Sequence, residues 1–158
     1  MDNLPGLIIK ANELMTENEK REIKACNDFT RRYGLSLNDA EIAELCICRE
    51  EALKASGRVE FGGGVLPKLI RAFCDSPYLE RDSYESTLAE LQEAFYYCKT
   101  ESMDMLSDDE LIELMVSVFN GRAQGSVDFL LGTSLDAMCR YAKRGRVPDN
   151  TVEAGDVL

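Results

Sequence analysis

Four short patterns in this sequence place an oxygen-bearing side chain three positions before a glutamate, and they constrain the fold more than any other feature. They occupy residues 16–19, 82–85, 107–110 and, in a looser form, 38–41. In such a capping box the first side chain accepts from a free backbone N–H of the first helical turn, and the glutamate reaches back to the N–H of the cap. Glycines stand where the helices should end, at Gly34, Gly57, Gly121 and Gly145. The sequence therefore predicts an all-α fold.

We predict a single-domain bundle of about six helices. Their approximate ranges are 17–33, 39–56, 67–74, 84–103, 108–119 and 126–144. The bundle domain should span residues 16–145, between an N-terminal segment (1–15) and a C-terminal tail (146–158). The fifth helix is apolar on nearly all sides, so it is expected at the centre of the bundle, with Leu114, Met115 and Val118 buried. Strand is expected at most over residues 7–9 or 58–61.

A Gly-Arg connector follows both the second and the fifth predicted helix, at Gly57-Arg58 and Gly121-Arg122. The order of helices and connectors therefore occurs twice, over residues 16–75 and 83–144. This echo would suit two three-helix halves related by duplication. The alternative is coincidence, because helix-ending glycines are common and few positions match.

The charge is strongly negative and unevenly distributed. The net charge is −11, and residues 81–110 hold nine carboxylates against two basic side chains, which gives −7 for that segment. Such a balance argues against nucleic acid as a direct partner, since phosphate binding needs clustered Lys and Arg. It is compatible with a basic protein partner. It is equally compatible with acidic helix N-termini that complement the helix dipole and keep the protein soluble.

Six cysteines and no histidine leave little scope for a metal or catalytic site. The cysteines are scattered without a CxxC pair, and zinc would have to be held by thiolates or carboxylates alone. The commonest general base of enzymes is also missing. We predict no metal site, no cofactor and no catalytic residue, and an enzymatic role is the less favoured interpretation.

Membrane insertion and secretion are not expected either. No run approaches the roughly 18 apolar residues of a membrane span. The first residues lack the basic n-region of a signal peptide. We expect a cytoplasmic protein with reduced thiols, either a monomer or a homodimer.

The glycine-rich connector before the third helix is the segment that helix formation explains least. Three consecutive glycines cost backbone entropy, and free N–H groups that lead into a helix N-terminus attract anions. Arg58 and Lys68 make this stretch locally positive, although Glu60 could pair with Arg58 and close the site. The candidate ligand-binding residues are Arg58, Glu60, Phe61, Gly62, Gly63, Gly64 and Lys68. The alternative is an architectural loop.

Two neighbouring tyrosines on the fourth helix offer a second candidate. Tyr96 or Tyr97 could line a pocket and use its hydroxyl as a polar contact. The alternative is a partly buried tyrosine whose hydroxyl faces water.

Two segments carry a resemblance to a known family. Residues 57–77 (GRVEFGGGVLPKLIRAFCDSP) and 91–100 (LQEAFYYCKT) resemble a small all-helical bacterial family of unassigned function. The resemblance covers most of residues 16–144 and includes no catalytic signature. It implies an intracellular bacterial protein and assigns no residue a role.

We interpret the chain as a non-enzymatic intracellular binding or interaction module. One alternative is a binder of a small anionic ligand, or a small enzyme, that uses connector 58–64. Another is an acidic decoy for a basic protein partner. An enzyme should show a deep pocket that gathers Arg58, Glu60 and a tyrosine, whereas a module should show exposed apolar surface.

Overall fold

The computed structural model describes residues 3–60, 64–132, 135, 137 and 139. Within them the chain forms six α-helices, two 3-10 helices and no strand, so the prediction of an all-α bundle of about six helices is confirmed. The α-helices are α1 (Asn3–Thr30), α2 (Asp39–Ser56), α3 (Leu66–Phe73), α4 (Tyr84–Glu101), α5 (Asp108–Asn120) and α6 (Val127–Gly132). The 3-10 helices are η1 (Arg31–Tyr33) and η2 (Arg81–Ser83). No helix in the described part of the chain has the length and apolar character needed to cross a membrane.

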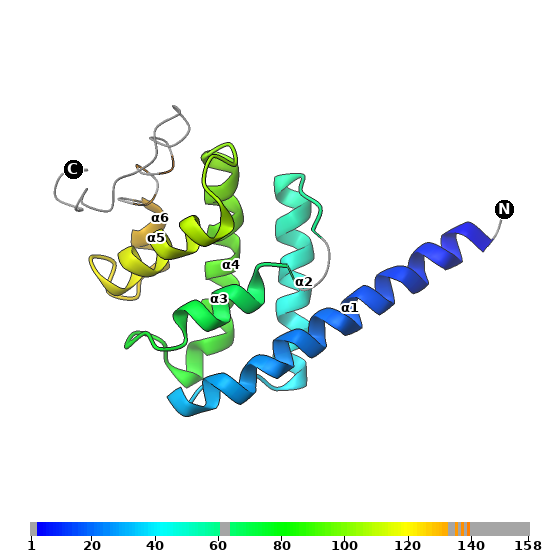
Figure 1. Ribbon diagram of the computed structural model, residues 1–158, viewed down its shortest axis with the longest axis horizontal. Coiled ribbons are helices and arrows are strands. Elements are labelled where there is room, and N and C mark those ends of the chain that lie inside the picture. Colours follow the sequence, from blue (N-terminus) through cyan, green and yellow to red (C-terminus); the bar gives the residue numbers. More distant parts are fainter. Residues whose placement is uncertain (1–2, 61–63, 133–134, 136, 138, 140–158) are drawn as a thin grey trace.

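Helix α4 is at the centre of the bundle (Figure 1). It packs against α2, α3, α5 and α6, while α1 lies across α2 and α3. The N-terminal part of α1 extends away from the other helices. The prediction that α5 is central is therefore wrong: among the helices of the described residues, α5 contacts α3, α4 and α6 but neither α1 nor α2. Met115 and Val118 are buried as predicted, but Leu114 is only partly buried because α5 packs through one side.

Two of the four predicted capping boxes form. Asn38 caps α2, with Glu41 N–H donating to its Oδ1 at 2.8 Å and its own N–H donating to Glu41 Oε1 at 2.9 Å. Ser107 caps α5 in the same way. The other two boxes are wrong. Thr16 lies inside α1, which begins at Asn3, and Asp82 lies inside η2.

The helix ends also differ in part from the prediction. Gly34 and Gly57 end helices in the left-handed conformation, with φ of 76° and 68°. Gly121 follows α5 with φ of −96°, and the left-handed turn comes later, at Gln124 and Gly125. Residues 7–9 are helical, not extended. Gly145, the predicted tail (146–158) and much of the sixth predicted helix lie outside the described residues.

The core consists of two clusters that share α3 and α4. Leu66 and Ile70 of α3 pack toward α1 and α2, whereas Leu69 and Phe73 pack toward α5 and α6. Helix α3 therefore divides one apolar face between the two clusters, and the exposed Lys68 and Arg71 lie on its other side. One cluster lies within residues 16–75 except for Tyr84 and Leu88, and the other lies within residues 83–144 except for Val65, Leu69 and Phe73. The two predicted halves therefore share core residues, and their origin by duplication stays a prediction.

Candidate functional site

A buried arginine lies between α1, α2 and the connector to α3. Arg49 is 5% exposed and follows Ile42 by seven residues on the inward face of α2. Its Nη1 lies 2.8 Å from Oε2 of Glu19 in α1, and its Nε donates to Oε1 of Glu60 at 3.2 Å. A buried guanidinium is tolerated only when it is paired. The two carboxylates therefore fix α1 and the connector to α2.

Tyr96 of α4 completes this cluster. Its side chain is buried, and its hydroxyl donates to Oε1 of Glu60. Burial, together with Glu60, raises the pKa of Tyr96 well above its usual range, so the phenol remains a donor. Burial lowers the pKa of Arg49, but Glu19, Tyr96 and Glu60 outweigh it and the net shift is upward, so the guanidinium stays charged. We call Glu19, Arg49, Glu60 and Tyr96 the buried ion cluster.

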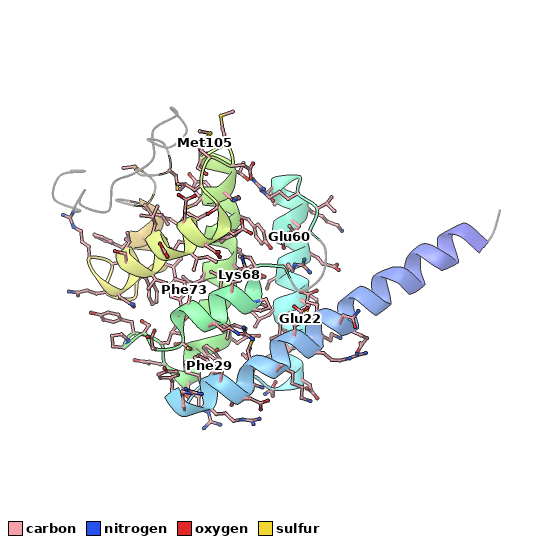
Figure 2. All side chains as sticks on the ribbon, viewed as in Figure 1. Glu22, Phe29, Glu60, Lys68, Phe73 and Met105 are labelled. Carbon is pink, nitrogen blue, oxygen red and sulfur yellow. The ribbon has the colours of Figure 1, made fainter. Side chains whose placement is uncertain are left out.

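The backbone of Gly64 lies against the side chains of the buried ion cluster. Its φ is +63°, a conformation that favours glycine. A Cβ at this position would lie 2.3 Å from Oε1 of Glu60 and 2.7 Å from Nη2 of Arg49. The last glycine of the run is therefore required by close approach to charged side chains. Figure 2 shows Glu60 beside α2, where the connector passes this helix.

The charged residues of the predicted anion site each have a different partner. Arg58 Nη2 lies 2.9 Å from the carboxylate of Asp104, and Lys68 Nζ lies 3.0 Å from that of Asp109. Glu60 belongs to the buried ion cluster. The remaining predicted residues, Phe61, Gly62 and Gly63, lie outside the described residues. Anion binding at the connector stays a prediction, and any anion would compete with these carboxylates.

A groove of about 570 Å³ lies between the C-terminal halves of α2 and α4. It is lined by Glu51, Ala52, Ala55, Ser56, Glu93, Tyr96, Tyr97, Thr100 and Glu101. None of these nine described residues carries a positive charge. Two tyrosines stand among three glutamates, and Tyr96 joins the groove to the buried ion cluster. We call this site the acidic groove.

The negative field continues along α2 and α4 beyond the acidic groove. Cys48 is partly exposed one turn before Glu51, and its pKa is raised by burial and then by four carboxylates. These belong to Glu51, Glu93, Glu44 and Glu85, two from each helix. The acidic groove is therefore one end of a longer negative strip.

Sequence reasoning identified part of this site. The suggestion that Tyr96 or Tyr97 lines a pocket is confirmed, since both line the acidic groove. Arg49 was missed, although its position seven residues after Ile42 on an apolar face was a usable signal. Glu51 and Glu93 were missed because one helix alone does not reveal which helix it will face. No group of side chains in the described part of the chain could hold a metal ion.

Comparison with known proteins assigns the chain to a family but does not indicate an activity. A family model described as "Family of unknown function (DUF6323)" matches residues 22–147. The match includes the acidic groove and three members of the buried ion cluster, and Glu19 precedes it. No curated protein and no solved structure matches the chain.

Proposed function

The chain belongs to the DUF6323 family of unknown function, and we propose that it is a protein-interaction module whose acidic groove receives a lysine or arginine of a partner protein. The single observation that carries this proposal is the lining of the acidic groove, with three glutamates, two tyrosines and no basic residue among the described ones. The proposal is non-catalytic. The protein would act as an interaction module, and its partner would be a basic protein.

The chemistry of the lining favours a cation. Each glutamate attracts a unit positive charge at about 4 Å by roughly 1–4 kcal/mol between the dielectric limits of water and a protein surface. A tyrosine ring adds about 0.5–1 kcal/mol for a cation over its face at an exposed site. Ala52 and Ala55 leave apolar wall for the aliphatic stem of a lysine or arginine.

The same field disfavours an anion. The groove lies in a protein of net charge −11. The nearest cation on the connector, Arg58, is bound to Asp104 and Thr100 at 2.9 and 3.2 Å. A phosphate or carboxylate would have to displace these partners and pass the glutamates. A basic segment meets neither obstacle, and the field would accelerate its association.

The test is a titration with a lysine-rich, otherwise polar peptide, followed by calorimetry at low and high salt. Binding should weaken by about tenfold or more in the double variant Glu51→Gln, Glu93→Gln, which corresponds to about 1.4 kcal/mol. It should also weaken as salt rises, because exposed charge pairs are screened. The matched control is Glu22→Gln, Glu113→Gln, which removes the same charge from exposed positions on α1 and α5.

Each alternative has its own outcome in this test. Equal affinity in the groove and control variants would mean that net charge alone attracts the peptide, and the proposal would fail. Binding of spermidine but not of the peptide would indicate a small-amine site. Binding of inorganic phosphate that is lost in Arg58→Ala would favour the connector.

A further inference from the structure

The loop between α4 and α5 presents two methionines to solvent. Met103 is 62% exposed and Met105 is 49% exposed, although methionine is among the residues most often buried. Both flank Asp104, the residue that binds Arg58. We call residues 102–107 the methionine loop.

The exposure of these methionines is not a result of loose attachment. Ser102 is buried and donates its hydroxyl to the carbonyl of Lys99 at 3.1 Å, and the N–H of Asp104 donates to the same carbonyl at 3.0 Å. Lys99 Nζ then donates to the carbonyl of Leu106 at 2.5 Å. The loop is therefore held at both ends, with its methionines outside.

Met103 and Asp104 also adopt left-handed backbone, with φ of 53° and 59°. Residues with a Cβ disfavour this conformation, and two in succession are unusual. Such outliers persist where the surrounding structure over-determines them, and they gather at functional sites. In this loop the left-handed conformations place Met103 in solvent next to Asp104, which is paired with Arg58.

The methionine loop adjoins the acidic groove. Thr100 and Glu101, which line the groove, immediately precede it. Arg58 connects the methionine loop to the acidic groove, because it donates to Thr100 Oγ1 at 3.2 Å and also binds Asp104. Val59, 80% exposed, follows Arg58. Figure 2 places Met105 at the end of the bundle where α4 meets α5.

We propose that the partner segment is amphipathic as well as basic: its cation enters the acidic groove, and its large apolar side chains cover the methionine loop and Val59. This inference rests on the proposed function and names the partner's chemistry. The negative charge of the acidic groove favours a basic residue of the partner. Val59 and the two methionines favour apolar side chains of the partner, and methionine side chains are flexible and polarisable enough to adapt to partners of different shape.

The experiment uses three peptides of equal length and the full chain. One is basic and amphipathic, one is basic with polar residues in place of the apolar ones, and one is acidic and amphipathic. The basic amphipathic peptide should bind about tenfold or more tightly than the basic polar one, and the acidic one should not bind measurably. In Met103→Ser, Met105→Ser, this advantage should disappear while affinity for the basic polar peptide stays within about twofold. Both methionines are exposed, so thermal unfolding should be nearly unchanged.

The outcomes separate this inference from the function on which it rests. Equal affinities for the two basic peptides would overturn the inference, as would tighter binding of the amphipathic peptide that persists in the methionine variant. Neither outcome would contradict the proposed function of the acidic groove. Failure of both basic peptides would overturn the function and the inference together. Concentration-dependent dimerisation that is lost in the methionine variant would assign the loop to a second copy of this chain and overturn the inference.

Discussion

The substitution Arg49→Met is expected to destabilise the fold by about 3–5 kcal/mol at neutral pH, because it leaves the buried carboxylate of Glu19 and the partly buried carboxylate of Glu60 without their counter-charge. Glu19 is 4% exposed, and its carboxylate lies 2.8 Å from the guanidinium that is removed. For a chain of this size the loss corresponds to a fall in Tm of about 6–20 °C. Thermal unfolding followed by far-UV circular dichroism measures it directly.

The pH dependence of this loss identifies its cause. Burial raises the pKa of Glu19 above its ordinary value of 4.5, and Arg49 provides the largest opposing influence. A carboxyl whose pKa is raised in the folded state binds its proton more tightly there. Its contribution to stability is therefore fully present below the unfolded pKa and is lost as pH rises through the folded pKa. Removing Arg49 raises the folded pKa further, so the deficit of Arg49→Met should widen from about pH 5 to pH 8.

Two further variants make the reasoning refutable. Glu19→Gln combined with Arg49→Met removes the unpaired charge and should recover at least about half of the loss. Arg31→Met breaks an exposed pair with Asp28 and should cost no more than about 1 kcal/mol. A deficit for Arg49→Met below about 1 kcal/mol, or one that is independent of pH, would show that the buried ion cluster does not stabilise the fold.

Four other predictions concern the helix caps, the core, the connector and the groove. Gly64→Ala should cost at least about 1–2 kcal/mol by urea unfolding, because φ is +63° and the added Cβ would lie 2.3 Å from a carboxylate oxygen of the buried ion cluster. Met115→Ala should cost about 2–5 kcal/mol in the same assay, and Leu114→Ala clearly less, since Met115 is fully buried and Leu114 is not. Asn38→Ala should cost about 0.5–2 kcal/mol through loss of the α2 cap. Cys48 should react about tenfold faster with a cationic disulfide reagent than with an anionic one, monitored by mass spectrometry, and equal rates would argue against the negative strip.

The helix boundaries that depend on local contacts were predictable from the sequence. At Asn38 and Ser107 the side chains of the cap and of the glutamate accept from each other's backbone N–H groups across one turn, so the local pattern suffices. At Thr16 the same pattern fails. Glu19 there binds Arg49, thirty residues later, and α1 continues upstream. A glutamate three positions after a cap residue does not reveal whether its partner is local or distant.

The candidate site was less predictable because it is assembled from separate helices. The sequence indicated that the glycine run is special and that Tyr96 could line a pocket, and both features meet at Glu60. The sequence could not indicate that Glu51 of α2 and Glu93 of α4 line the same groove. That arrangement depends on the packing of α2 against α4, which no local pattern specifies.

The most direct test of the central claim is amide chemical-shift mapping of the ¹⁵N-labelled chain during titration with the basic amphipathic peptide. Saturable shifts should be concentrated on the C-terminal halves of α2 and α4, at Glu51, Ala55, Glu93 and Tyr97, and extend to the methionine loop. They should be strongly reduced in Glu51→Gln, Glu93→Gln. Shifts that are absent at saturating peptide, or confined to surfaces away from α2 and α4, would contradict the assignment of the acidic groove as the binding site.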